Sequence, residues 1–196
     1  IHLDSRPLIP RPETEWWTEL CIKELSIRSE PFRCLDLFAG SGCVGIALLT
    51  HLPLTTVDFG EIERKHFRTI QKNILENGID ESRTKIIESD VFSNIVDTYQ
   101  TIVANPPYIP DNRKLEDSLA FEPKEALFGG KTGTDFLERC VRDAPKHLEK
   151  DGVMYLEFDP GQEDAIRESA KTVGMQVEFH PDQFGLPRLA VLQLQT

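Results

Sequence analysis

The chain has 196 residues, of which 39% are hydrophobic and 28% are charged, and its formal net charge is −11. A chain of this length usually folds as one domain with a sizeable core. Its apolar runs fall short of the roughly 20 residues that span a bilayer, and its acidic charge argues against non-specific nucleic-acid binding, which needs a basic surface. Four scattered cysteines predict reduced thiols in an intracellular protein: Cys21, Cys34, Cys43 and Cys140.

The first fifteen residues are predicted to form a hairpin or an extended arm. They carry the run LIPRPETE at positions 8–15. Pro10 and Pro12 disfavour helix before Glu13, because proline lacks an N–H and clashes with the preceding turn. Thr14 is then the predicted N-cap of an amphipathic helix over residues 15–27. Taken alone, this run indicates only the start of a capped helix.

A short strand is predicted over residues 33–37, followed by a glycine-rich turn and an apolar helix to about residue 52. This order of elements binds nucleotides in α/β folds. Gly40 and Gly42 let the backbone approach a ligand closely, since neither has a Cβ. Asp36, near the strand end, is a predicted acceptor for a ligand ammonium group. The spacing Gly40-x-Gly42-x-x-Gly45 also matches a dinucleotide fingerprint, so NAD binding stays open as an alternative.

The second strand, predicted over residues 54–59, leads to two candidate partners for the hydroxyls of a ribose. An acidic residue near this strand end is the usual partner, and both Asp58 and Glu61 qualify. Glu61 comes just before a helix predicted over residues 63–76, at the carboxyl end of the strand where ligands bind. We therefore favour Glu61 and interpret Asp58 as a solvated strand residue.

The third strand is predicted over residues 84–88. Asp90 follows it, at a position where aspartate commonly accepts from an adenine amino group while the next residue, Val91, packs on the ring. Asp90 also fits the N-cap of a short turn. The fourth strand, predicted over residues 101–104, leads into the most distinctive turn of the chain, Asn105-Pro106-Pro107-Tyr108.

This turn is stiff, because each proline fixes its own φ and restricts the residue before it. It presents the Pro106 carbonyl oxygen beside the Asn105 side-chain oxygen, which gives two acceptors close together. Two acceptors on a rigid turn suit a planar NH2 group, and Tyr108 adds a flat face. The turn resembles the signature of S-adenosylmethionine-dependent methyltransferases that methylate a planar nitrogen, either on bases or on glutamine amides.

The rest of the chain continues the alternation of strands and helices, which predicts a doubly wound α/β sheet. An irregular, charged segment over residues 109–132 comes first, and long loops are often functional. The predicted elements after it are a helix from 133 to about 149, a strand over 153–158, a helix over 162–173, and an antiparallel pair of strands over 175–180 and 189–195.

Three stretches together resemble one family, the HemK/PrmC protein-(glutamine-N5) methyltransferases that act on peptide-chain release factors. They are residues 8–15, Asn105-Pro106-Pro107-Tyr108-Ile109, and Glu122-Pro123-x-x-Ala126-Leu127-Phe128-Gly129-Gly130. The interval from Asp36 to Glu61 (61 − 36 = 25) is likewise typical of class I methyltransferases. The resemblance implies a Rossmann-like, seven-stranded class I fold whose last strand is antiparallel.

The resemblance also implies the reaction. The substrate would be the glutamine of a Gly-Gly-Gln motif in a class I release factor, with S-adenosylmethionine as cofactor and S-adenosylhomocysteine as product. The implied catalytic residues are Asn105, Pro106, Pro107 and Tyr108. The implied cofactor-binding residues are Thr14, Asp36, Phe38, Ala39, Gly40, Ser41, Gly42, Glu61, Asp90, Val91 and Asn105.

The same resemblance predicts how the chain is organised. Residues 1–15 would form a linking arm and residues 16–196 the methyltransferase domain, with the family's helical N-terminal recognition domain outside this chain. A monomer without a metal or membrane contact is expected. Phe38 replaces a glycine of the family pattern in a way that resembles fungal mitochondrial members, so the expected location is mitochondrial, and otherwise cytoplasmic.

Two further departures from the family pattern are Glu61, where aspartate is usual, and Glu157-Phe158-Asp159 at the end of the fifth strand. Three alternatives stay open. The first is an amino-methyltransferase that acts on an exocyclic base nitrogen of RNA or DNA. The second is an NAD-dependent oxidoreductase, and the third is a non-catalytic binding module in which Phe38 blocks the cofactor.

Overall fold

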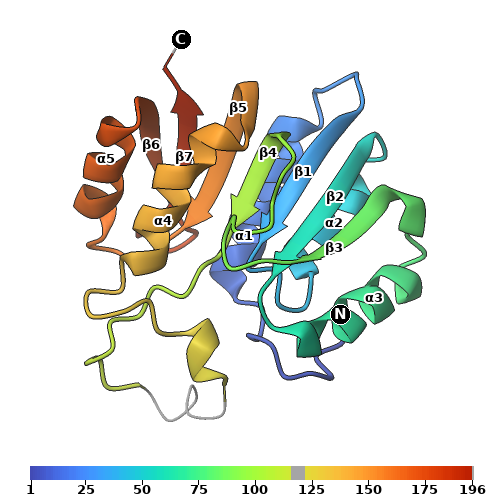
Figure 1. Ribbon diagram of the computed structural model, residues 1–196, viewed down its shortest axis with the longest axis horizontal. Helices are drawn as coiled ribbons and strands as arrows, with labels where there is room; N and C mark the ends of the chain where they lie inside the picture. The colour runs from blue at the N-terminus through green and yellow to red at the C-terminus, as the bar shows by residue number, and fades with distance from the viewer. Residues whose placement is uncertain (116–121, 196) are drawn as a thin grey trace.

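Seven strands form one sheet in the order β3-β2-β1-β4-β5-β7-β6 in the computed structural model, which describes residues 1–115 and 122–195 (Figure 1). β7 is antiparallel to both of its neighbours, and the other neighbouring pairs are parallel. The predicted class I fold with an antiparallel last strand is therefore confirmed. The strands are β1 (Phe32–Leu37), β2 (Thr55–Glu61), β3 (Thr84–Glu88), β4 (Tyr99–Ala104), β5 (Leu148–Glu157), β6 (Met175–Pro181) and β7 (Pro187–Leu194).

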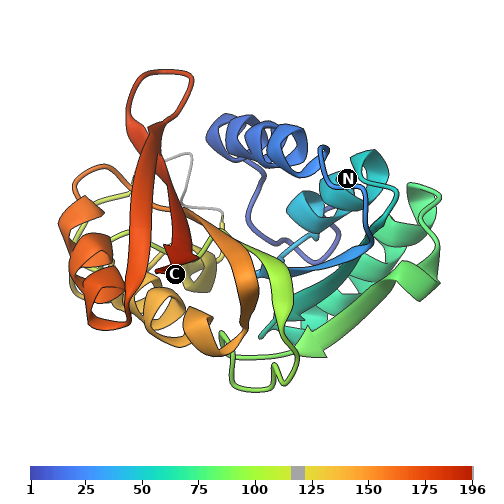
Figure 2. The same cartoon turned by 90° about the horizontal axis from the view of Figure 1, so that it is seen from above.

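Helices cover both faces of the sheet (Figure 2). One face carries α1 (Pro12–Leu25), α2 (Cys43–His51) and α3 (Phe67–Glu76), and the other carries α4 (Asp135–Asp143) and α5 (Glu163–Thr172). Short 3-10 turns at Arg64–His66, Glu81–Arg83, Lys124–Ala126 and Ala144–Lys146 complete the described elements. This arrangement buries apolar side chains on both sides of the central strands, as a parallel sheet requires.

The alternation of side chains along each strand decides which residues meet α1. Val103 of β4 and Tyr155 of β5 are buried in the cluster that contains α1 and α2, while their neighbours Ile102 and Met154 belong to the cluster on the opposite face. Because strand side chains alternate with a period of two, the next position on the α1 face is 105 in one strand and 157 in the other. The fold therefore brings Asn105 and Glu157 to the same side of the sheet.

The start of α1 differs from the prediction. The helix begins at Pro12, its N-cap is Arg11, and it ends at Leu25. Pro12 occupies the first helical position, where its missing N–H is not needed and its fixed φ suits the helix. The expected N-cap role of Thr14 is therefore wrong, and this residue lies buried within the first turn of the helix.

The boundary between α4 and β5 also differs. The helix was expected to run to about residue 149, but it ends at Asp143, and a 3-10 turn containing Pro145 follows. Proline cannot continue an α-helix without losing a hydrogen bond. β5 then begins at Leu148, five residues before the predicted start, and pairs irregularly with β4 before the regular ladder from Val153 onward.

Residues 1–11 contain no strand and form an extended arm with one turn, not a hairpin. The His2 backbone N–H donates to Asn73 Oδ1 at 2.6 Å, and Ser5 Oγ lies 2.7 Å from His66 Nδ1. The arm is thereby held against α3 and the turn before it. The division of the chain at residue 15 stays a prediction, and part of the irregular segment, residues 116–121, lies outside the described residues.

Candidate active site

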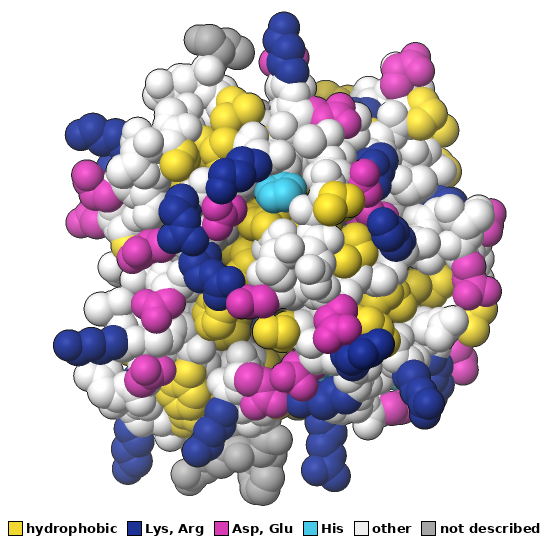
Figure 3. Space-filling model, viewed as in Figure 1, with side chains coloured by type: hydrophobic (Ala, Val, Ile, Leu, Met, Phe, Trp, Pro, Cys, Tyr) yellow, Lys and Arg dark blue, Asp and Glu magenta, His cyan; other side chains and the backbone are white. Residues whose placement is uncertain are grey.

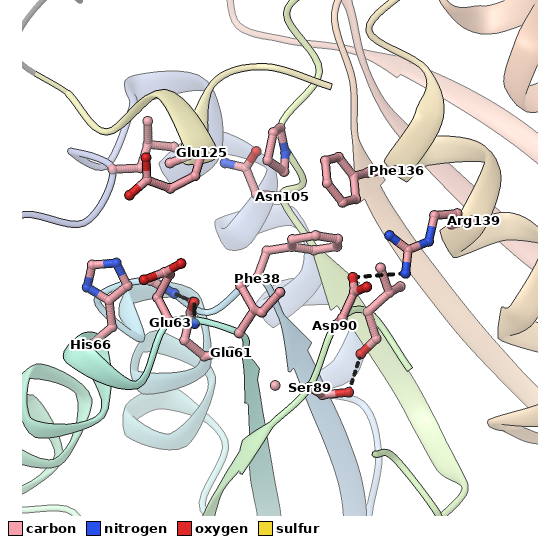
Figure 4. A pocket seen from close by; sticks show the side chains of 17 residues that line it. Phe38, Glu61, Glu63, His66, Ser89, Asp90, Asn105, Glu125, Phe136 and Arg139 are labelled. Carbon is pink, nitrogen blue, oxygen red and sulfur yellow. Dashed lines mark hydrogen bonds and ion pairs between the residues drawn. The ribbon is translucent and has the colours of Figure 1, made fainter. Parts of the chain in front are cut away.

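A cavity of about 290 Å³ opens at the carboxyl ends of β1, β2, β3 and β4 (Figure 4). Ligands of open α/β sheets bind at this edge, where the strand order reverses on either side of β1. Figure 4 shows three glutamates and His66 on one side, and two aromatic rings with the Arg139–Asp90 pair on the other. The cavity is lined by Leu8, Phe38, Gly40, Gly60, Glu61, Ile62, Glu63, His66, Ser89, Asp90, Val91, Asn105, Pro107, Glu125, Ala126, Phe136 and Arg139.

Glu61 is the last residue of β2, and two backbone groups orient its carboxylate. Oε2 accepts from the Gly40 N–H at 2.8 Å, and Oε1 accepts from the Glu63 N–H at 2.8 Å. Burial raises the pKa of Glu61, and these backbone donors oppose that rise. Each oxygen keeps a second lone pair, so the group can accept from two neighbouring hydroxyls. This pair of acceptor oxygens fits the diol of a ribose.

Asp58, the alternative partner for a ribose, lies away from the cavity wall and is buried, so its interpretation as a solvated strand residue is wrong. Its Oδ2 accepts from Arg33 Nη2 at 3.0 Å and from the Tyr99 hydroxyl at 2.8 Å. These contacts are structural links from β2 to its neighbour β1 and to β4, the strand beyond β1. The geometry therefore favours Glu61 over Asp58 as the residue that faces a ligand.

The other side of the cavity is a chain of contacts that begins on the glycine-rich turn. The Phe38 and Phe136 rings meet edge to face with centroids 5.6 Å apart. Arg139 Cζ lies 5.5 Å from the Phe136 centroid, and its Nη2 pairs with Asp90 Oδ1 at 2.8 Å. Two residues of α4 thus join Phe38 to Asp90 and complete the wall.

Asn105 stands between this cavity and a second one. The second cavity, of about 230 Å³, is lined by Leu8, Arg11, Glu13, Asn105, Pro106, Tyr108, Ile109, Ala126, Leu127 and Arg188. Asn105 Nδ2 donates to Thr14 Oγ1 at 3.1 Å, whereas Asn105 Oδ1 is buried without a partner among the described residues. Buried polar atoms are nearly always hydrogen-bonded, so this free acceptor indicates a ligand site.

The segments around Asn105 hold one another in place. Arg11 forms an ion pair with Glu122, which also accepts from the Ile9 N–H at 3.2 Å. The Ile109 N–H donates to the Leu127 carbonyl at 2.8 Å. A Cβ on Gly129 would collide with the Pro107 carbonyl oxygen, so only glycine fits there. The three stretches singled out in the sequence therefore form one assembly around the Asn105 turn.

Comparison with known proteins identifies the family that this site belongs to. The profile of the Methyltransferase small domain matches residues 16–122. A release factor glutamine methyltransferase from Thermodesulfovibrio yellowstonii is 32% identical over 199 aligned positions, which cover 98% of this chain and 71% of that protein. The chain belongs to the release factor glutamine methyltransferase family. It spans about two thirds of the length of the curated members that it matches.

Other similar proteins agree with this family. A ribosomal protein uL3 glutamine methyltransferase from Bradyrhizobium diazoefficiens is 38% identical over 134 positions, which cover 67% of this chain and 42% of that protein. The solved release factor-specific protein-(glutamine-N5) methyltransferase from Alicyclobacillus acidocaldarius has a TM-score of 0.58 at 23% identity and covers 100% of this chain and 99% of that one. The second match shows a common fold.

The structure brings some of the predicted site residues of this glutamine methyltransferase together and leaves others outside the walls. Phe38, Gly40, Glu61, Asp90, Val91, Asn105 and Pro107 line the first cavity, and Asn105, Pro106 and Tyr108 line the second. Asp36, Ala39, Ser41, Gly42 and Thr14 line neither. Asp36 Oδ2 instead accepts from the Gly45 N–H at 2.9 Å, and Thr14 contacts Asn105.

Four residues that line the cavity are missing from the sequence prediction. They are Phe136 and Arg139 of α4 on one side and Glu63 and His66 on the opposite side. The start of the helix after Gly133 is an ordinary amphipathic pattern, so its sequence carries no signal for a ligand. For His66, the short spacing to Glu61 is a signal that sequence reasoning could have used.

Asp36 gives this methyltransferase an expected dependence of stability on pH. Burial raises the pKa of Asp36 to about 7 from 3.8. Between these values the folded state binds more protons than the unfolded state, so stability falls as pH rises. From pH 5 to pH 8 we expect a loss of about 2–3 kcal/mol from this group. Urea unfolding at both pH values should show the loss in the wild type and not in Asp36→Asn, and equal losses would contradict the prediction.

Phe38 has a backbone conformation that suits glycine better. Its φ is +59°, and left-handed backbone costs a non-glycine residue roughly 1–2 kcal/mol. Phe38→Ala and Phe38→Gly both remove the ring, so we expect Phe38→Gly to be the more stable of the two by about 1 kcal/mol. Phe136 lies in the helix α4 and provides a matched control, where Ala should be more stable than Gly. If urea unfolding shows Ala to be more stable than Gly at position 38 as well as at position 136, the Phe38 backbone is not strained.

Proposed function

We propose that this chain is the catalytic domain of an S-adenosylmethionine-dependent methyltransferase that methylates the N5 nitrogen of the glutamine in a Gly-Gly-Gln motif of a class I release factor. The observation that carries the proposal is Asn105 Oδ1, a buried acceptor without a partner among the described residues, on a turn shared by two cavities. An acceptor held in this way suits a primary amide better than a hydride acceptor or a phosphate.

The first cavity fits S-adenosylmethionine in the chemistry of its walls. Glu61 would accept from the ribose hydroxyls, and Asp90 and Val91 would border the adenine. The turn at Gly40 and the Phe38 ring would border the amino-acid end. A volume of about 290 Å³ lies just below the range of roughly 300–1,000 Å³ that is typical of small-molecule sites.

The second cavity is where the glutamine side chain would enter. When bound, the cofactor supplies a methyl group that its sulfonium sulfur activates. Asn105 Oδ1 and the Pro106 carbonyl would each accept one N–H of the substrate amide, which holds the nitrogen at the boundary between the two cavities. Both acceptors favour the positive charge that develops on nitrogen as the new bond forms. The proton that the nitrogen then loses passes to solvent.

Tyr108 borders the substrate side with little freedom to move. Its hydroxyl donates to Glu157 Oε1 at 2.9 Å, and burial raises its pKa well above the usual value. The neutral phenol therefore stays hydrogen-bonded, and its ring would pack against the plane of the substrate amide.

Ribosomal protein uL3 is a second candidate substrate, because a uL3 glutamine methyltransferase is among the relatives. Both candidates present a glutamine amide and fit the same turn. A base amino group fits the surface less well, since basic side chains are interspersed with acidic ones over the face shown in Figure 3. The net charge of −11 also disfavours nucleic acid.

The deciding experiment uses the purified chain and S-adenosylmethionine carrying a labelled methyl group. The enzyme and the labelled cofactor are incubated separately with a class I release factor, with its Gly-Gly-Gln→Gly-Gly-Ala variant, with uL3 and with an RNA hairpin. We expect labelled methyl groups on the unmodified release factor and none on its variant. Label in uL3 alone would move the proposal to that substrate, and label in the RNA alone would overturn the glutamine reaction.

Location and assembly stay predictions. A mitochondrial location, the likeness to fungal mitochondrial members and a monomeric state rest on resemblance, and the curated relatives named above are bacterial. Among residues 1–115 and 122–195, no helix has the length and apolar character to cross a membrane, and no group of three or more His, Cys, Asp or Glu side chains is placed to hold a metal ion.

A further inference from the structure

Glu157 is a completely buried carboxylate at the end of β5, and it faces α1. Its Oε2 accepts from the Thr14 hydroxyl at 2.7 Å and from Trp17 Nε1 at 2.5 Å, and its Oε1 accepts from the Tyr108 hydroxyl at 2.9 Å. A charge in the core is costly unless such donors satisfy it. The cavity walls do not include Glu157, so it would not touch a ligand directly.

The contacts of Thr14 determine which way the Asn105 amide points. An ionised carboxylate only accepts hydrogen bonds, and a threonine hydroxyl has a single proton. Because that proton goes to Glu157, Thr14 Oγ1 can only accept from Asn105. The Asn105 atom at 3.1 Å from Thr14 must then be the NH2 group, which leaves Oδ1 on the other side. Sterically the two orientations of an amide are nearly equivalent, so this hydrogen-bond chain decides between them.

We propose that Glu157 is a positioning residue that, through the Thr14 hydroxyl, turns the acceptor oxygen of Asn105 toward the substrate amide. The inference rests on the proposed function and goes beyond it, since it assigns the direction of a catalytic hydrogen bond to two residues that line neither cavity. If Glu157 could donate to Thr14, the hydroxyl proton would be free to point at Asn105. The amide would then turn its NH2 group toward the substrate, where it would face another donor.

The groups around Glu157 favour one direction for the hydrogen bonds that run from Asn105 through Thr14 to Glu157. Burial raises the pKa of Glu157, while the hydrogen bonds from Thr14, Trp17 and Tyr108 and the nearby Arg188 guanidinium favour the charged form. Three hydrogen-bond donors and one nearby cation thus oppose the cost of burying the carboxylate. They favour the acceptor-only state that the direction of these hydrogen bonds requires.

The experiment compares four variants of the full chain: Glu157→Gln, Thr14→Val, Thr14→Ser and Tyr155→Phe. The first two variants interrupt the series of hydrogen bonds from Glu157 through Thr14 to Asn105 at different points, and Thr14→Ser keeps a hydroxyl at position 14. Tyr155→Phe is the matched control, because it removes another hydrogen bond between β5 and α1, from Tyr155 to Glu24 at 2.7 Å. Each variant is measured for kcat on a Gly-Gly-Gln peptide, for the Kd of S-adenosylhomocysteine, and for the NMR shifts of the Asn105 side-chain NH2.

We expect Glu157→Gln and Thr14→Val to lower kcat at least about thirtyfold and to shift the Asn105 NH2 resonances, with the Kd of S-adenosylhomocysteine within threefold of the wild type. Thr14→Ser and Tyr155→Phe should keep kcat within threefold. The inference is overturned if Thr14→Val keeps kcat, or if Tyr155→Phe loses as much activity as Thr14→Val. A wild type that binds S-adenosylhomocysteine but methylates no glutamine would overturn the proposed function instead.

Discussion

Asn105→Ala is expected to lower kcat by about 10²–10³-fold, with the Kd of S-adenosylhomocysteine within about threefold of the wild type. Preorganised polar groups that act on charge developing in the transition state are worth about this much. The side-chain oxygen of Asn105 is buried and has no partner among the described residues, so nothing in the described part of the chain competes with the substrate for it. Single-turnover kinetics on a Gly-Gly-Gln peptide would measure the effect on the chemical step.

Asn94→Ala is a suitable control for this prediction. Asn94 is exposed, and its NH2 group donates to the Glu88 carbonyl at 2.7 Å, away from the reacting centre. Its removal should leave both kcat and affinity unchanged. A loss of only a few-fold in Asn105→Ala would mean that the Pro106 carbonyl alone positions the amide, and the role given to Asn105 would be wrong.

The sequence predicts the sheet well because its strands are short, apolar and separated by clear turns. Thr84–Glu88 matches the prediction at both ends, and β1 and β4 differ from it only at their starts. Two of the errors in helix boundaries occur where proline acts. Pro12 begins a helix that it was expected to delay, and Pro145 follows the early end of α4. In both cases the helix boundary depends on where the proline lies within the helical turn. The presence of a proline in the sequence does not specify that position.

The candidate site divides in the same way. Residues at a strand end or just after it, such as Glu61, Asp90 and Asn105, could be predicted because the carboxyl ends of parallel strands meet at one edge. Thr14 lies about ninety positions from Asn105, and no sequence pattern pairs it with Glu157. Phe136 and Arg139 reach the cavity only because α4 crosses this edge of the sheet. Tertiary packing creates such contacts, and no local pattern records them.

Glu61→Ala is the second variant with a large expected effect, and its effect falls on the cofactor. We expect the Kd of S-adenosylhomocysteine to rise at least about 100-fold, because hydrogen bonds to a charged group contribute about 1.5–3 kcal/mol each and two would be lost. The Gly40 and Glu63 N–H groups, which now donate to Glu61, would also lose their partner. Calorimetric titration of wild type and variant measures the change directly.

Asp58→Asn separates affinity from stability in the same experiment. Asp58 is buried and holds Arg33 and Tyr99, so its variant should unfold at lower urea concentration. Its affinity for S-adenosylhomocysteine should nevertheless stay within threefold of the wild type, since the carboxylate faces neither cavity. A loss of affinity in Asp58→Asn with little loss in Glu61→Ala would reverse the assignment of the ribose partner. The two carboxylates lie in the same strand, so the expected difference arises from their positions along β2 and from the face of the sheet to which each side chain points.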